Sequence, residues 1–560
     1  MSAIVVLLAG LVAMALGYFI YSKFIAEKIF QLDPNFRTPA NEFEDGVDYV
    51  PTNKFILWGH HFTSVAGAAP IVGPAIAVIW GWLPAFLWVI FGTIFFAGVH
   101  DAGAIWASVR NRARSIGAVT GDVIGARARS LFMIVIFLVL LMVNAVFAVV
   151  IANLLIANPS AVVPAWGAIL VALIIGQMIY RRRTNLLTVS IIGVVALYGL
   201  ILIGPMVPIS LPESFLGLPQ NSLWILILFL YAAIASLLPV WVLLQPRDYI
   251  NGLQLFIGLG IVYAAVLIGN PTMVAPAVNP DVPAGTPSLL PLLFVTIACG
   301  AISGFHGLVS SGTTSKQIKN EKDVRFVGYF GAVGEGSLAL AAILATSAGF
   351  ATLAEWQALY SSFGAGGVNA FVQGGANIVS AGLGLPQDIA VTLLTVMAVL
   401  FAGTTMDTGI RLQRYIMQEW GTIYNIPALR SIPVATVVAV GACVALAFGA
   451  GGLDGSGGLL IWPLFGTTNQ LLAGLTLLVI TVIIVRLGRP MWFTLIPLAF
   501  LLTMTTYALL IQLVSFYNDG NWFLLFLDVV ILIAAILVLL ECVGVLRKHL
   551  RERDARQSTG

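Results

Sequence analysis

The stretch that decides the fold reads Gly67-Ala68-Ala69-Pro70-Ile71-Val72-Gly73-Pro74, and it lies inside an apolar segment at 59–80. Proline has no amide hydrogen, so Pro70 leaves the carbonyl of Ala66 without its helical donor, and Pro74 does the same to Pro70. In lipid, a freed carbonyl must bind protein, water or an ion. The stretch therefore predicts an interrupted transmembrane helix.

Apolar segments of this kind recur along the whole chain. The 560 residues are 59% hydrophobic and only 9% charged, whereas a soluble domain has about 25% charged residues. A bilayer core is spanned by about 20 helical residues. We predict an all-α integral membrane protein with about 15 transmembrane helices, at 3–22, 59–80, 82–110, 130–156, 164–180, 185–205, 222–243, 249–270, 290–311, 326–348, 386–410, 430–450, 459–485, 491–516 and 522–546.

The basic residues support this division independently. All 27 Lys and Arg lie in, or at the edges of, alternate gaps between the predicted helices. Cytoplasmic loops collect Lys and Arg, so we expect the N-terminus outside and the C-terminus in the cytoplasm. The segment at 3–22 is read as a retained first span. The net charge of +3 comes from these loops, so it argues for no nucleic-acid partner. The predicted partner is the lipid bilayer, because the chain is so apolar.

A second proline lies in a comparable place. Ser236-Leu237-Leu238-Pro239 interrupts the predicted helix at 222–243, five segments after the first interruption and in a helix of opposite direction. Paired interruptions in inverted repeats are typical of secondary transporters with a binding site at the bilayer midplane. We therefore predict two five-helix repeats, at 59–205 and 222–410. The alternative is that these prolines are ordinary residues of membrane helices, where proline is common.

The remaining regions flank this core of 59–410. Residues 1–58 are expected to form one helix and a cytoplasmic loop, and 411–546 a four-helix membrane region of open role. The tail at 547–560 is polar and too short to be the signalling domain that a nutrient sensor would need. The oligomeric state is left open by the sequence.

A few ionisable residues lie inside the predicted helices, where each costs at least a few kcal/mol. A proton-coupled carrier needs a carboxylate or a histidine there that can exchange a proton. We assign coupling to Glu335, Asp101, Asp407 and His61. Glu335 could instead hydrogen-bond the backbone of a broken helix, and Asp101 could instead pair with a cytoplasmic arginine.

The substrate is expected between the two interruptions, against freed backbone groups, with the helices at 130–156 and 290–311 also lining it. The helix at 290–311 carries a polar stripe that ends in hydroxyl residues. With the freed carbonyls of the helix at 59–80, these hydroxyls could form an oxygen cage for sodium, although hydroxyls also satisfy backbone groups. The candidate substrate residues are Gly67, Ala68, Pro70, Gly73, Ser236, Pro239, Ser303 and His306, and the candidate ion residues are Ser310, Ser311 and Thr314.

Histidines offer a second class of function. Imidazole and carboxylate groups bind divalent transition metals, so a metal-binding membrane protein or metal carrier could use His60, His61, His100 and His306. No His-Glu-x-x-His helix motif is present, which argues against a metalloenzyme. We predict no enzyme activity and no cofactor. The three cysteines are interpreted as small apolar packing residues.

Several motifs resemble the carbon starvation protein A family. They are Asp48-Tyr49-Val50-Pro51-Thr52-Asn53-Lys54, Gly59-His60-His61-Phe62, the 67–74 stretch, Leu238-Pro239-Val240-Trp241, Pro246-Arg247-Asp248-Tyr249, Ser303-Gly304-Phe305-His306, Asp407-Thr408-Gly409 and 462–470, in order along residues 45–475. The resemblance implies a bacterial inner-membrane carrier with a five-plus-five inverted-repeat fold. It also implies uptake of peptides or pyruvate under carbon starvation, coupled to protons.

Overall fold

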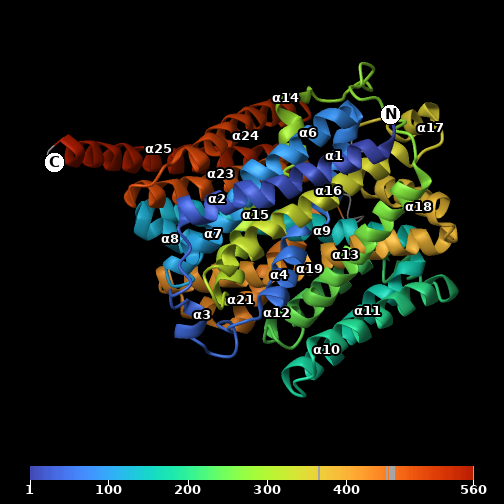
Figure 1. The fold of residues 1–560 in the computed structure, drawn as a ribbon, viewed down its shortest axis with the longest axis horizontal. Coiled ribbons are helices and arrows are strands. Elements are labelled where there is room, and N and C mark those ends of the chain that lie inside the picture. The colour runs from blue at the N-terminus through green and yellow to red at the C-terminus, as the bar shows by residue number, and fades with distance from the viewer. Residues whose placement is uncertain (364–365, 450–451, 453–460, 559–560) are drawn as a thin grey trace.

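The computed structural model describes residues 1–363, 366–449, 452 and 461–558, and most of these are helical (Figure 1). The first half contains α1 (Ala3–Leu16), α2 (Ser22–Phe24), α3 (Pro39–Glu42), α4 (Lys54–Ala66), α5 (Ala69–Ala77), α6 (Trp82–Phe91), α7 (Gly98–Arg110), α8 (Ile116–Val123), α9 (Ala126–Ala157), α10 (Val162–Tyr180), α11 (Leu186–Ile203), α12 (Gln220–Leu237) and α13 (Leu244–Gly269). A small antiparallel hairpin of β1 (Ser214–Phe215) and β2 (Leu218–Pro219) precedes α12.

The second half is equally helical. It contains α14 (Leu289–Thr296), α15 (Gly304–Gly312), α16 (Phe330–Ala348), α17 (Leu353–Leu359), α18 (Gly367–Leu383), α19 (Gln387–Ile423), α20 (Pro427–Arg430), α21 (Ile432–Gly449), α23 (Trp462–Arg486), α24 (Trp492–Asn518) and α25 (Trp522–Ser558).

The helix lengths confirm a multi-pass membrane protein. Within the described ranges, 13 helices are long and apolar enough to cross a membrane, and the bent pair α4–α5 makes 14. The predicted span at 290–311 is present as two short halves, α14 and α15. The span predicted to end at 410 continues as α19 to Ile423. Residues 450 and 459–460, at the ends of two predicted spans, lie outside the described residues.

The first predicted interruption is present. Helix α4 ends at Ala66, α5 begins at Ala69, and the two bend by 43°. The break lies at Gly67, whose φ of +46° is a left-handed value that favours glycine. Pro70 lies in the first turn of α5, where proline is well tolerated. The break is therefore a glycine turn followed by a proline-initiated half-helix.

The second interruption predicted from Ser236 and Pro239 is wrong. Helix α12 ends at Leu237, and Pro239 lies in the turn before α13. The carbonyls at this helix end bind two arginines of α19: Arg411 donates to the carbonyls of Ala235 at 2.9 Å and Leu238 at 2.6 Å, and Arg414 donates to that of Ser236 at 2.7 Å. Because these carbonyls have charged donors, the chain turns here and does not continue as a broken span.

The second interruption lies instead between α14 and α15, at residues 297–303. It contains no proline, and Gly300 takes a left-handed φ of +101°. The two interruptions are neighbours, because a Cβ built on Gly300 would lie 3.4 Å from Cα of Pro70, and one built on Gly73 would lie 3.3 Å from Cα of Ile297. The broken helices thus cross at their breaks.

Two sets of five helices pack reciprocally around these breaks. One set is α4–α5, α6–α7, α9, α12 and α13, and the other is α14–α15, α16, α19, α21 and α23. Helix α9 packs on α19, and both α12 and α21 contact each of those two; α4 packs on α13 as α15 packs on α23. Such matched contacts are expected of an inverted repeat. The predicted division at 59–205 and 222–410 stays a prediction, and this packing favours repeats that begin at α4 and α14.

Helices α10 and α11 form a hairpin between the third and fourth helices of the first set, and they lie at one margin of the molecule in Figure 1. A pair of spans can be inserted there without changing the direction of the helices that follow. Helices α24 and α25 pack against α23 on another side. Helix α24 also packs against α14, through Phe294 and Phe500.

Candidate functional site

A chain of ionisable side chains lies beside the second interruption. His306 of α15 places Nδ1 2.9 Å from Oδ2 of Asp101 and Nε2 3.1 Å from Oε2 of Glu335. Asp101 of α7 also contacts Nδ1 of His100 at 2.7 Å through its second oxygen. Oε1 of Glu335, on α16, accepts the N–H of Gly300 at 2.9 Å. We call His100, Asp101, His306 and Glu335 the relay.

All four side chains of the relay are buried, with at most 1% of the residue surface exposed. Burying one unpaired charge is costly, so a buried charge persists where it has partners. A histidine between two carboxylates satisfies this condition and can pass a proton along the row. The structure thus brings together Asp101, Glu335 and His306. Glu335 also forms the backbone hydrogen bond that the sequence offers as its alternative role.

The relay is bordered by an amide that the sequence analysis did not select. Asn469 of α23 accepts the N–H of Phe305 at 2.8 Å, in the first turn of α15, through Oδ1. Its Nδ2 donates to Oγ of Ser303 at 2.9 Å and to Sγ of Cys299 at 3.2 Å. The predicted substrate residue Ser303 is therefore held by α23. A signal existed in the polar run at 462–470, which lies in an otherwise apolar helix.

A second buried cluster joins α4, α12, α13 and α19. Arg247 forms an ion pair with Asp407 and contacts Oδ1 of Asp248 at 3.0 Å. Tyr231 donates to Asp407 at 2.7 Å. The other oxygen of Asp248 lies 2.7 Å from Nδ1 of His60. Asp407, predicted to act in coupling, thus belongs to this cluster, and within the described chain it forms no ion pair with a member of the relay.

Hydropathy places Arg247 and Asp248 in a gap between predicted spans, and His60 and His61 at the start of one, and the structure buries all four. Helix α13 begins at Leu244 and α4 at Lys54, so each helix starts earlier than the predicted span. Local hydropathy does not detect such starts, because mutual pairing lets charged residues continue a membrane helix.

The predicted sodium cage is not assembled in this conformation. Ser311 donates to the carbonyl of Gly307 at 2.7 Å and accepts the N–H of Ile116 at 3.0 Å. Thr314 contacts Nδ1 of His61 at 2.9 Å. Of the three predicted ion residues, only Ser310 has a hydroxyl without a hydrogen-bond partner in the described structure. A sodium site stays a prediction.

Among the described residues, the four histidines of the metal alternative do not form one group of metal-binding side chains. His60 contacts Asp248 and Thr313, His61 contacts Thr314, and both His100 and His306 contact Asp101. Within the described chain, the group of metal-binding side chains that does converge is Cys299, His306 and Glu335. The structure thus offers a different donor set from the one predicted.

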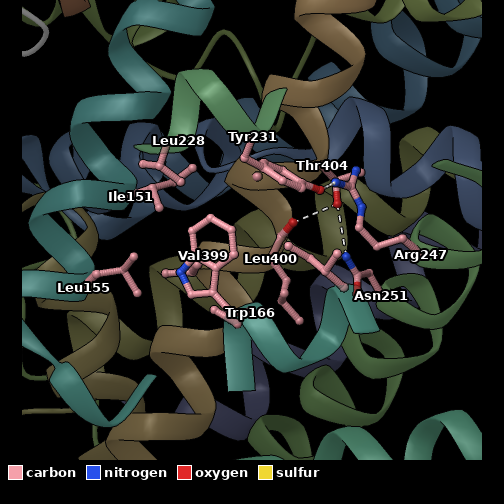
Figure 2. A pocket seen from close by; sticks show the side chains of 13 residues that line it. Ile151, Leu155, Trp166, Leu228, Tyr231, Arg247, Asn251, Val399, Leu400 and Thr404 are labelled. Carbon is pink, nitrogen blue, oxygen red and sulfur yellow. Dashed lines mark hydrogen bonds between the residues drawn. The ribbon is translucent and has the colours of Figure 1, made fainter. Parts of the chain in front are cut away.

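A cavity of about 50 Å³ opens beside the second cluster, between α9, α10, α12, α13 and α19. Tyr231, Arg247, Asn251 and Thr404 gather at one end, and Ile151, Leu155 and Leu228 form the apolar end (Figure 2). Sites for small-molecule ligands usually measure several hundred Å³. This cavity therefore has no room for a peptide in this conformation.

A family model extends over this architecture. Residues 2–362 and 349–508 match the model described as Carbon starvation protein CstA. The chain belongs to this family. The match covers both interruptions, the relay and the second cluster, so all of these features lie within the part of the chain that the CstA family shares.

Curated relatives in the CstA family are transporters. The peptide transporter CstA of Campylobacter jejuni is 34% identical, over 93% of this chain and 81% of the relative. The pyruvate/proton symporter BtsT of Escherichia coli is 30% identical, over 92% of this chain and 82% of the relative. Among solved structures, the manganese transporter of Eremococcus coleocola covers 90% of this chain and 99% of its own at 13% identity, with a TM-score of 0.47.

Proposed function

We propose that this protein is a secondary transporter that imports a small organic nutrient, pyruvate or short peptides, together with protons. It acts in the bacterial inner membrane, with its N-terminus outside and its C-terminus in the cytoplasm, during carbon starvation. The observation that carries the proposal is the buried relay, because Glu335 ends it on the backbone of an interrupted helix. The names of the relatives support both substrate classes.

The substrate binds at the crossing of the two breaks. Helix α5 begins at Ala69 and α15 at Gly304, so two half-helices start in the interior of the molecule. A helix N-terminus has unpaired N–H groups and a partial positive charge. It favours a carboxylate, which pyruvate and peptides both carry. The residues proposed to line this position are Gly67, Ala68, Pro70, Gly73, Ser303 and His306.

Proton coupling follows from competition at Gly300. In the present structure, Glu335 accepts the N–H of Gly300. A substrate carboxylate next to an ionised Glu335 would be repelled, and it would compete for this N–H. Protonation of Glu335, through His306 and Asp101, removes the repulsion and weakens the bond to Gly300. Proton and substrate then bind together, which is the requirement for symport. His61 and Asp407 remain proposed helpers in proton transfer.

Uptake into proteoliposomes tests the function. Purified protein should accumulate labelled pyruvate or a labelled dipeptide when the outside is acidified, and an uncoupler should abolish the accumulation. A sodium gradient alone should drive no uptake. Accumulation driven by sodium at equal pH, or no accumulation of either substrate under any gradient, would contradict the proposal.

A further inference from the structure

Three different metal-binding groups meet at the second break. A sulfur of Cys299, a nitrogen of His306 and a carboxylate oxygen of Glu335 lie within 4.8 Å of one another. All three residues are buried, with exposed fractions of 6%, 0% and 1%. Cys299 lies in the connection between α14 and α15, His306 in α15 and Glu335 in α16. The group therefore joins the interruption and the half-helix that follows it to a neighbouring helix.

The imidazole of His306 is oriented as a metal ligand would be. Its Nδ1 is held by Oδ2 of Asp101 at 2.9 Å, and a carboxylate on the far nitrogen is the usual support of a metal-binding histidine. Its Nε2 lies 3.1 Å from Oε2 of Glu335 as an ion pair, without the geometry of a hydrogen bond. A cation placed between the two groups would replace this ion pair and meet the Cys299 sulfur as well.

We propose that Cys299, His306 and Glu335 bind one thiophilic divalent cation, of the Zn²⁺ or Cd²⁺ class. Thiolate, imidazole and carboxylate are the three ligand types of Zn²⁺, which takes four ligands in tetrahedral geometry. Three protein ligands leave the fourth position to water. A thiolate ligand disfavours Mg²⁺ and Ca²⁺, which prefer oxygen. Binding releases the thiol proton of Cys299, and any proton on Nε2 of His306, to water.

Occupation of this site stops transport. The cation takes up Nε2 of His306 and a carboxylate oxygen of Glu335, which are the groups that pass the proton. It also ties the connection at Cys299 and the half-helix α15 to α16, so the break cannot rearrange. This consequence rests on the proposed function, whereas binding of the cation does not.

Cobalt binding tests the site directly. Co²⁺ replaces Zn²⁺ with the same ligands and gives a sulfur-to-cobalt charge-transfer absorption that reports a thiolate ligand. The purified full-length protein should bind one Co²⁺ with this absorption, and Zn²⁺ should displace it. Cys299→Ser should remove the absorption, whereas Cys443→Ser, which changes another buried thiol, should retain it. Absence of the band in the unaltered protein, or its survival in Cys299→Ser, would overturn the proposal.

Inhibition of uptake supplies the second measurement. Zn²⁺ should inhibit pyruvate or dipeptide uptake, and each variant is compared with its own rate in the presence of a chelator. Cys299→Ser should need at least tenfold more Zn²⁺ for half-inhibition. A protein that binds Co²⁺ but transports neither substrate would contradict the proposed function alone. A protein that transports but gives no cobalt band would contradict the metal site alone. Equal inhibition of Cys299→Ser and Cys443→Ser by Zn²⁺ would do the same.

Discussion

At the scale of single residues, Glu335 has a structural contact and a proposed proton role, and a substitution can separate the two. Its Oε1 accepts the N–H of Gly300 at 2.9 Å, and its Oε2 faces His306 at 3.1 Å. Glutamine keeps an acceptor for Gly300 but cannot be ionised. The structural role should therefore survive in Glu335→Gln while the proton role is lost.

We expect Glu335→Gln to abolish accumulation driven by a proton gradient, down to the level of empty liposomes, with the unfolding temperature in detergent nearly unchanged. Glu335→Ala serves as the control that removes both roles, and it should also lower the unfolding temperature. Normal gradient-driven accumulation by Glu335→Gln would exclude this carboxylate as the coupling group.

Asn469 is a second residue whose contribution can be measured. It satisfies the N–H of Phe305 and holds Ser303 and Cys299. Leaving a buried donor unsatisfied costs about 1–3 kcal/mol. Asn469→Ala should lower the free energy of unfolding by about this amount, measured by thermal or chemical unfolding in detergent. Thr503→Ala, at an exposed site on α24, should have a much smaller effect; equal losses would refute the assignment.

At the scale of elements, the first break depends on a glycine. Gly67 has a φ of +46°, and a Cβ there would lie 2.8 Å from Phe147 and 2.8 Å from Oγ1 of Thr405. Both the backbone conformation and the packing thus oppose any side chain. The bend between α4 and α5 therefore depends on Gly67 and on its close packing against α9 and α19.

We expect Gly67→Ala to impair transport severely and to destabilise the fold by at least about 1 kcal/mol, because a left-handed conformation is unfavourable for alanine. Gly260→Ala is the matched control, since Gly260 lies inside α13 and a Cβ there has open space. Alanine is favoured over glycine in a helix by about 1 kcal/mol. Wild-type uptake by Gly67→Ala would show that the bend is not needed.

The end of α12 is held by the two arginines of α19. Arg411 binds the carbonyls of Ala235 and Leu238, and Arg414 binds that of Ser236. Hydrogen bonds from charged donors contribute about 1.5–3 kcal/mol each. Arg414→Met should therefore destabilise the protein by about 1.5–3 kcal/mol, read from the shift in unfolding midpoint. Arg181→Met, at an exposed position, should leave the midpoint nearly unchanged, and a similar shift in both would argue against this capping role.

At the scale of the whole molecule, the membrane orientation is the testable feature. The gap that contains position 281 carries no Lys or Arg, whereas the gap that contains position 320 carries Lys316, Lys319 and Lys322. The two gaps flank α14 and α15, so their sides decide the direction of the second broken helix.

A cysteine introduced at 281 should react with a membrane-impermeant maleimide added outside intact cells, and one at 320 should react only after lysis. The background carries Cys542→Ser, and it keeps Cys299 and Cys443 because both are buried. The Cys542→Ser protein without an introduced cysteine is the control, because any labelling of it comes from the native thiols. Labelling of 320 but not 281 in intact cells would show the opposite orientation. It would also contradict the proposal that substrate enters from the outer side.

Composition and local hydrogen bonding, which can be read from the amino-acid sequence, predict one part of this molecule. Hydropathy predicts the spans because each must exceed the bilayer thickness. The run of Gly67 to Pro74 indicates the first break because glycine and proline act on their own backbone. The scarcity of charge inside spans singled out Asp101, His306 and Glu335, because only a functional or paired group is tolerated there.

Only the tertiary structure decided which of these groups meet. The second break, at 297–303, has no proline, and its Gly300 is held by Glu335 of another helix. The carbonyls at the end of α12 are satisfied by arginines far along the chain, so Pro239 marks a helix end. Arg247 can be buried because Asp407 and Asp248 pair with it. Each outcome depends on contacts between residues that are distant in the sequence. A local sequence pattern does not show which of these residues meet, so it cannot predict the energy of the contact.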